Sequence, residues 1–159
     1  MIEVEIEDDA WSAAVSRPKV IASAAARAAL RASLGPERGD RGAVILLTGD
    51  DAVAELNREF LGKPGPTNVL SFPAPESARP HLGDVALAYG VCAREAREQD
   101  KLLKHHLMHL VVHGVLHLVG YDHQTESEAE DMEALERRVL AGLGAPDPYR
   151  MAPGEPHAR

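Results

Sequence analysis

The pattern of apolar and polar positions predicts four β-strands before residue 90. The stretch "IEVEIE" (2–7) alternates apolar and charged residues, which favours a strand with one buried face. "AVILLTG" (43–49) is a continuous apolar run, typical of a strand covered on both faces. "TNVLSFP" (67–73) and "GDVALAY" (83–89) predict two further strands, separated by the loop "APESARPHL" (74–82).

Two helical segments are interleaved with these strands. The alanine-rich segment 18–34 predicts a helix that Pro18 opens and the pair Gly35-Pro36 ends. A shorter helix over about residues 52–60 follows Asp50 and Asp51, either of which can cap it.

Helices dominate the second half of the chain. Segment 92–104 predicts one helix, and segment 103–119 predicts a second helix or its continuation. Gly120 ends it, because glycine readily takes the left-handed geometry that stops a helix. Thr125 and Glu128 have capping-box spacing and open a last helix that runs to about residue 140.

The order of these elements indicates an α+β fold or mixed α/β layers. A chain of 159 residues is long enough for one domain with its own core, and the sequence contains neither an internal repeat nor a domain linker. We expect a single domain over residues 1–145 and a loose C-terminal tail, rich in glycine and proline, over residues 146–159.

The composition of the chain indicates the cellular compartment in which the protein works. No apolar run approaches the length of a membrane span, and the alternating, acidic N-terminus is not a secretory signal. The single cysteine, Cys92, excludes an internal disulfide and fits a reducing cytosol, so we expect a cytoplasmic protein. Any transition-metal site must then be built largely from histidines and carboxylates.

The formal net charge of −8 argues against a nucleic-acid partner, but the distribution of charge weakens that objection. Residues 1–11 hold five acids and residues 126–136 hold six more. Between Arg58 and Lys104 there are seven Lys or Arg against six acids, so the middle of the chain is near neutral.

Three of the eight histidines lie within "HGVLHLVGYDH" (113–123). On a helix, His113 and His117 lie one turn apart on one face, where both imidazoles can reach one ion at roughly 2.0–2.1 Å if it is zinc. The turn at Gly120 then lets His123 supply a third nitrogen. Three nitrogen ligands leave an open position for water, the layout of a catalytic zinc. The alternative is that these histidines merely fill space on a crowded helix.

Neighbouring groups have less specific interpretations. His109 lies one turn before His113, and we interpret it as a support for the ligands, a substrate contact or a core histidine. His105 and His106 are expected at the surface. Asp122 can steady an imidazole or simply belong to the turn.

The spacing H-x-x-x-H-x-x-G-x-x-H also matches the ligands of metzincin proteases. Those enzymes need a glutamate after the first histidine as general base, and here that position is Gly114. A peptidase is therefore the less favoured interpretation.

The motif "HGVLHLVGYDH" resembles the signature of the YbeY family, bacterial endoribonucleases of ribosomal RNA maturation. Four further segments are similar to that family: "LNREFLGKPGPTNVLSFP" (56–73), "LGDVALA" (82–88), "EAEDMEALE" (128–136) and "DPY" (147–149). The resemblance covers about residues 44–149.

The resemblance implies a zincin-like α+β layer in which a small mixed sheet packs against the metal-bearing helices. It implies that His113, His117 and His123 are the ligands of one zinc ion. It also implies single-strand-specific RNA cleavage in 16S rRNA 3′-end maturation and late ribosome quality control, with an rRNA precursor and the small ribosomal subunit as partners and no membrane.

One position departs from the family pattern. The family usually has an arginine just before the "GK" of the second block, where this chain has Leu61. Arg58 or Lys63 are candidate replacements, with an ordinary solvated side chain as the alternative for each. The departure bears on the efficiency of catalysis more than on the metal site.

RNA cleavage also needs proton transfer and local positive charge. His109, Asp84 and Asp122 are candidates for proton transfer, and the sequence does not choose among them. Arg94, Arg97, Lys101 and Lys104 fall within a stripe about 80° wide if segment 92–104 is one helix, the best candidate for a phosphate-binding face that this chain offers. The alternative is an ordinary solvated helix face. The alternative functions are a non-enzymatic ribosome assembly factor with a structural metal, and a zincin-like metallopeptidase.

Overall fold

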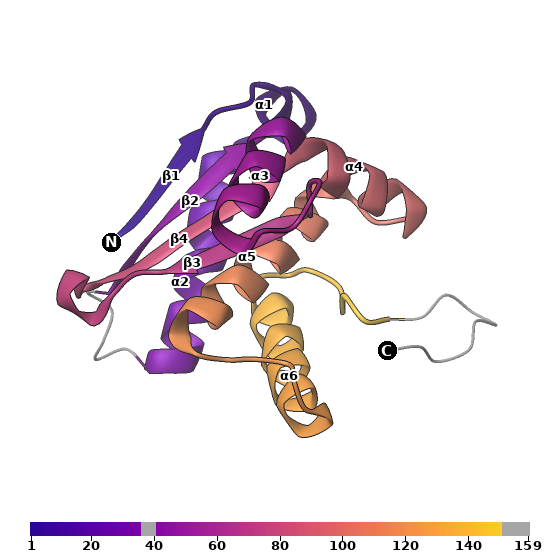
Figure 1. Ribbon diagram of the computed structural model, residues 1–159. Helices are drawn as coiled ribbons and strands as arrows, with labels where there is room; N and C mark the ends of the chain where they lie inside the picture. The colour runs from indigo at the N-terminus through magenta and orange to yellow at the C-terminus, as the bar shows by residue number, and fades with distance from the viewer. Residues whose placement is uncertain (36–40, 151–159) are drawn as a thin grey trace.

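A four-stranded mixed sheet with helices on both faces forms the protein, as the computed structural model shows for residues 1–35 and 41–150 (Figure 1). The strands are β1 (Ile2–Ile6), β2 (Gly42–Thr48), β3 (Val69–Pro73) and β4 (His81–Ala88). Their order is β1-β2-β4-β3; β3 is antiparallel to β4, and the other neighbours are parallel. The expected mixture of helices and strands is confirmed.

The helices in the described part of the chain follow the predicted order, with one addition. The short α1 (Ala10–Ala14), which buries Trp11, was not predicted. The others are α2 (Pro18–Leu34), α3 (Asp50–Leu56), α4 (Tyr89–Glu98), α5 (Leu103–Val119) and α6 (Glu126–Gly142), with a π-helical turn η2 (Asn57–Leu61) and a 3₁₀ turn η3 (Glu76–Ala78).

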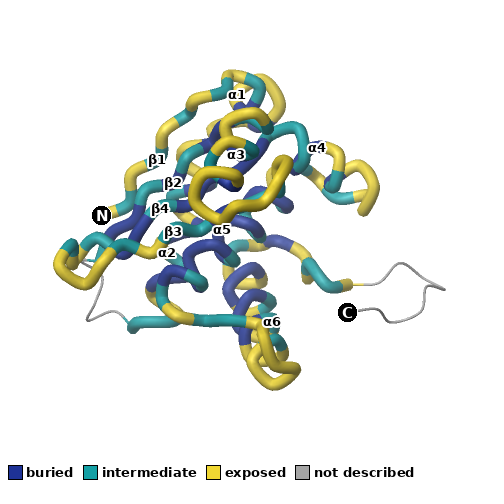
Figure 2. The backbone as a smooth tube through the Cα atoms, viewed as in Figure 1, coloured by how far each residue is buried: buried dark blue, intermediate teal, exposed yellow. Residues whose placement is uncertain are grey.

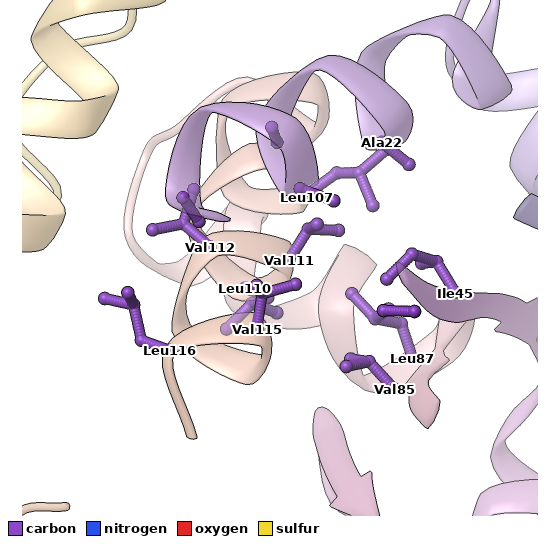
Figure 3. Close-up of a cluster of buried hydrophobic side chains, with 14 of the residues drawn as sticks. Ala22, Ile45, Val85, Leu87, Leu107, Leu110, Val111, Val112, Val115 and Leu116 are labelled. Carbon is purple, nitrogen blue, oxygen red and sulfur yellow. The ribbon is translucent and has the colours of Figure 1, made fainter. Parts of the chain in front are cut away.

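The main core lies between the sheet and the pair α2 and α5 (Figure 3). Ile45, Val85 and Leu87 face Leu107 and Val111 of α5 there, and all five are fully buried. Each such side chain contributes about 1.5–3 kcal/mol by leaving water, so the position of α5 is strongly fixed. Figure 2 shows the middle of α5 buried.

A smaller apolar cluster covers the opposite face of the sheet. It contains Val53 of α3 with Leu70, Ala86 and Ala88 of the sheet. In Figure 1, α3 lies in front of the sheet and α2 behind it. β2 is therefore covered on both faces, as its continuous apolar run predicts.

Most predicted helix ends are confirmed. Gly120 caps α5 with φ 111°, and Gly35 caps α2 with φ 81°. The capping box is present, with the Thr125 hydroxyl accepting from the Glu128 N–H and the Glu128 carboxylate accepting from the Thr125 N–H, each at 3.1 Å.

The prediction that Asp50 or Asp51 caps α3 was wrong. Gly49 occupies the N-cap position and no side chain caps the helix. Asp50 turns instead toward α4, where it accepts the Val91 N–H at 3.0 Å and pairs with Arg94 at 3.3 Å.

The basic stripe on one helix was also wrong. α4 ends at Glu98, and Asp100 adopts a left-handed φ of 55° before α5 begins. Lys101 thus lies between the helices, where its Nζ donates to the Pro148 carbonyl at 2.9 Å. Four charges at helical spacing share a face only while the helix continues, and this one stops.

None of the helices in the described residues is both long and apolar enough to cross a membrane.

Candidate metal centre

Helix α5 and the turn after it bring together the three histidines that the motif predicts as ligands. The Nε2 atoms of His113 and His117 lie 3.1 Å apart, because the residues are one helical turn apart. The chain turns at Gly120. The centroid of the His123 ring then lies 5.9 Å from the ring centroid of His113 and 5.2 Å from that of His117. One nitrogen from each ring lies within 4.8 Å of the other two.

The three histidines line an open cleft of about 540 Å³ beside the edge strand β3. His113 and His117 are half-buried and His123 is exposed, so a ligand can reach all three. The remaining lining residues come from β3, the segment before it and the turn after α5: Leu61, Asn68, Val69, Leu70, Ser71, Pro73, Gly120, Tyr121 and Asp122.

The donor atoms fit a tetrahedral zinc ion. Two nitrogens bound to one zinc at about 2.0–2.1 Å lie roughly 3.3–3.4 Å apart, close to the 3.1 Å between His113 and His117. Burial, with the charges of His113 and His123 next, lowers the pKa of His117. His117 is therefore neutral at pH 7, as a metal ligand must be.

A buried carboxylate lies directly behind His113. Glu136 of α6 is fully buried, and its Oε2 lies 2.7 Å from the Nδ1 of His113. Its Oε1 lies 3.0 Å from the Nε2 of His109 and accepts the hydroxyl of Tyr149. Tyr149 belongs to residues 147–149, which pack against α6; residues 151–159 of the predicted tail lie outside the described residues.

These contacts decide the charge of Glu136. Burial alone raises the pKa of a carboxyl, but hydrogen bonds from His109 and His113, and their charges, outweigh it and hold the Glu136 pKa at about 2. Glu136 is therefore ionised at neutral pH. The same burial, followed by the charge of Glu136, raises the pKa of Tyr149 well above its ordinary value.

A second group, His109, His113 and Glu136, also has ligand atoms close enough for a metal. Its separations of 2.7 and 3.0 Å are those of ordinary N–H···O hydrogen bonds. Hydrogen bonds explain the short distances among His109, His113 and Glu136 without a metal ion. The nitrogens of His113, His117 and His123, in contrast, lie at the open cleft. The cleft group is the better candidate.

Of the three candidates for proton transfer, only Asp122 lines the cleft, where its Oδ1 accepts the His123 N–H at 2.7 Å. His109 lies behind the ligands against Glu136 and Tyr149. Asp84 lies on β4, outside the cleft lining, and pairs with His81 at 3.0 Å.

The prediction that His106 lies at the surface was wrong. Only 4% of its side chain is exposed, and its Nε2 lies 2.9 Å from Glu95 of α4. Glu95 in turn accepts from the Asn68 amide at 3.0 Å, next to the cleft. His106 belongs to a buried polar cluster at the other end of α5.

Leu61 lies at the cleft, where the family usually has arginine. It is 52% exposed, and Figure 2 shows the segment between α3 and β3 as exposed. Arg58 pairs with Glu55 at 3.1 Å and does not line the cleft. Lys63 is exposed on the same segment.

Sequence reasoning missed Glu136 and Tyr149 as neighbours of the histidines. A signal was present for Glu136, since it falls among the apolar positions Met132, Leu135, Val139 and Leu140 of one helix face. A charged residue on such a face needs a buried partner. Tyr149 is part of no such helix pattern, and its segment "DPY" (147–149) was noted only for its similarity to the family.

Fold and site together define an α+β protein with three histidines gathered in an open cleft, a candidate metal site. A family model described as "Endoribonuclease YbeY" matches residues 6–144, so the chain belongs to the YbeY family.

Relatives agree with this assignment over nearly the whole chain. A protein of Azorhizobium caulinodans named endoribonuclease YbeY is 54% identical over 155 residues, covering 94% of this chain and 96% of the relative. One of Maricaulis maris with the same name is 51% identical, covering 93% and 91%. Among solved structures, TM1509 of Thermotoga maritima is similar, with a TM-score of 0.56, 25% identity and coverage of 98% of this chain and 100% of that one.

Proposed function

We propose that this protein is a cytoplasmic, zinc-dependent endoribonuclease that cleaves single-stranded RNA. Its substrate is the 16S rRNA precursor at the 3′ end, and it acts in late quality control of the small ribosomal subunit. The observation that carries the proposal is the convergence of His113, His117 and His123 at an open cleft. Membership of the YbeY family, whose relatives carry the name endoribonuclease, points to RNA.

The three imidazoles would hold the ion, and the helix carrying two of them beneath a mixed sheet supports a zincin-like arrangement. When bound, zinc supplies Lewis-acid stabilisation of phosphate charge and activates water at neutral pH. Asp122 is the carboxylate among the lining residues of the cleft, and it is our candidate for proton transfer there. His109 acts from behind the ligands, not on the substrate.

The outer edge of β3 supplies a backbone donor to the cleft. Bonds from the Ala88 N–H to the Asn68 carbonyl and from the Ala74 N–H to the Leu82 carbonyl fix the ladder with β4. In that register, residues 69, 71 and 73 direct their backbone groups away from β4. Because Ser71 lines the cleft, its N–H is placed to donate to a phosphate oxygen.

The same edge disfavours a peptidase. An extended peptide would bind β3 by adding a strand, which needs several free backbone donors. The Val69 N–H already donates to the Asn68 side chain at 2.6 Å, and Pro73 has no N–H. A single donor suits one phosphate better than a peptide strand.

Gly114 gives a second reason. A Cβ at this position would lie 2.6 Å from the Val85 side chain and 3.1 Å from the Ser71 hydroxyl. Residue 114 therefore faces the sheet, where the glutamate of a metzincin-type peptidase has no room. The glycine permits close packing of α5 on β3 and β4.

The test is cleavage of a single-stranded 16S rRNA precursor fragment by purified protein, with zinc content measured in the same samples. His117→Ala is the inactive variant, Asp131→Asn on the exposed side of α6 is the matched control, and a double-stranded version tests strand preference. We expect the wild type and Asp131→Asn to cut the single strand, and His117→Ala to lose both zinc and cleavage.

Two other results would contradict the proposal. Equal cleavage by zinc-loaded wild type and zinc-free His117→Ala would show that the measured cleavage does not come from the histidine site. A folded, zinc-loaded wild type that does not cut would favour an assembly factor in which the metal is structural and Leu61 marks lost catalysis.

A further inference from the structure

Glu136 is a buried acid whose two oxygens are both engaged. It lies on the apolar face of α6 beside Met132, Leu135 and Leu140, with none of its surface exposed. An apolar residue of similar size would fit these neighbours, and replacing buried charges by such residues is often neutral or stabilising. Core stability is therefore a poor reason for a carboxylate here, and its contacts indicate another.

The first contact fixes the orientation of a metal ligand. The Oε2 of Glu136 lies 2.7 Å from the Nδ1 of His113. A carboxylate oxygen accepts hydrogen bonds, so the Nδ1 is the donor and carries the proton. In the neutral ring the lone pair then lies on Nε2. That Nε2 faces His117 across 3.1 Å, toward the cleft. Imidazoles that bind a metal through one nitrogen commonly donate from the other to such a carboxylate.

The second contact holds the carboxylate itself. Its Oε1 accepts the hydroxyl of Tyr149 and lies 3.0 Å from His109. Arg137 stacks over the Tyr149 ring at 5.1 Å and pairs with Asp147 at 3.3 Å.

The same carboxylate of Asp147 accepts the Tyr149 N–H at 2.8 Å, and Lys101 donates to the carbonyl of Pro148. Several hydrogen bonds and ion pairs thus hold residues 147–149 in place. The segment packs beside Glu136, on the side of His113 away from the cleft.

We propose that Glu136 is a positioning residue for His113, and that Tyr149 locks Glu136 in place, so that the C-terminal segment 147–149 sets the zinc affinity of the cleft. The inference deepens the proposed function and rests on it only in that His113 binds the ion. Glu136 touches neither the metal nor the substrate; it acts through the tautomer and the orientation of His113.

The experiment measures zinc affinity by competition with a chelator, for the full chain and three variants. Glu136→Gln keeps the shape and removes the charge, Tyr149→Phe removes one hydroxyl, and Asp131→Asn removes a carboxylate from the exposed side of the same helix. We expect zinc affinity to fall about 10–100-fold in Glu136→Gln. We expect a smaller fall in Tyr149→Phe and none in Asp131→Asn.

Nitrogen-15 NMR of the histidine side chains supplies a measurement that a purely structural role would not change. In the wild type His113 should be protonated at Nδ1, and in Glu136→Gln it should populate both tautomers. Thermal unfolding of the zinc-free proteins identifies any variant that does not fold. If Glu136→Gln does not fold, the zinc affinity of Tyr149→Phe tests the inference in its place.

Unchanged zinc affinity and an unchanged His113 tautomer in folded Glu136→Gln would overturn the inference, as would unchanged affinity in Tyr149→Phe. RNA cleavage is measured separately. A wild type that binds zinc without cutting RNA would refute the proposed function, while the zinc affinities would still decide the role of Glu136.

Discussion

The two ends of α5 each pair a histidine with a glutamate, and only one end forms a candidate site. Near its beginning, His106 lies 2.9 Å from Glu95; further along, His113 lies 2.7 Å from Glu136. The side chain of His106 is 4% exposed and that of His113 is 25% exposed. Both pairs join one imidazole nitrogen to a glutamate carboxylate. They differ in the surroundings of the second nitrogen of each histidine ring.

That second nitrogen decides the role. The Nδ1 of His106 is buried and has no hydrogen-bond partner among the described residues, so the ring only links α5 to α4. The Nε2 of His113 faces His117 at the cleft, where a ligand can approach. A histidine–carboxylate pair thus becomes a candidate metal ligand only where the far nitrogen meets open space and further donors.

The largest effect should come from His117→Ala at the cleft end. Loss of one of three ligands should lower zinc affinity by more than about 100-fold and abolish cleavage, since even supporting residues cost 10–100-fold. The zinc-free variant should unfold at nearly the same temperature as zinc-free wild type, because His117 is half-buried beside open space. Metal analysis measures the zinc content, and calorimetry measures the unfolding temperature. If His117→Ala keeps its zinc, the cleft end of α5 is not the metal site and does not differ in role from the His106 end.

His106→Ala should show the reverse pattern. The substitution leaves a cavity at a buried site and removes one of the two side-chain partners of Glu95, while the Asn68 amide stays. The free energy of unfolding, measured in urea, should therefore fall by about 2–4 kcal/mol. Zinc content should be unchanged. His105→Ala, one position earlier and only partly buried, is the control and should cost much less. Loss of zinc in His106→Ala would show that the two clusters act as one.

Acid should weaken the two ends in different pH ranges. Burial lowers the pKa of His106 below 6.5, so the folded state disfavours its protonation, and this stability is full above pH 6.5 and declines as the pH falls below it. The pKa of Glu136 is lowered from 4.5 to about 2, so its contribution is full above pH 4.5 and is lost between pH 4.5 and 2.

Stability curves against pH for zinc-free wild type, His106→Gln and Glu136→Gln measure these ranges. The advantage of the wild type over His106→Gln should shrink below pH 6.5, and its advantage over Glu136→Gln below pH 4.5. A single common range would contradict the separation.

The smallest effect concerns the rim of the cleft. Leu61→Arg adds a positive charge beside the histidines and should tighten single-stranded RNA binding several-fold at low salt. One added phosphate contact should steepen the plot of log affinity against log salt by about 0.7. Fluorescence anisotropy in the His117→Ala background avoids cleavage. Val20→Arg, at an equally exposed apolar position on α2, is the control. If both substitutions tighten RNA binding equally, the effect comes from the net charge of the protein and not from a contact at the cleft.

Local signals in the sequence predicted much of this molecule. The four strands, the limits of α2, the end of α5 at the left-handed Gly120 and the capping box at Thr125 all follow from patterns within a few residues. The sequence left open whether α5 begins a new helix or continues the one before it. The gathering of His113, His117 and His123 was predictable for the same reason, because one helix and one turn carry all three.

What the sequence did not reveal depends on distant segments. Helical spacing places His106 on a face of α5 but does not say that Glu95 of α4 covers it. Nor does it show that Glu136 and Tyr149, 23 and 36 residues beyond His113, dock behind that ligand. The basic stripe failed over residues 99–102, which separate α4 from α5 and in which Asp100 has a left-handed backbone.

X-ray absorption at the zinc edge of zinc-loaded protein tests most directly whether the three cleft histidines hold the ion. We predict three imidazole nitrogens at about 2.0–2.1 Å and one further light ligand. His123→Ala should reduce the imidazole count by one, and Glu136→Gln should leave the count unchanged. Two imidazoles with a carboxylate, insensitive to His123→Ala, would place the ion at His109, His113 and Glu136 and contradict the assignment of the cleft.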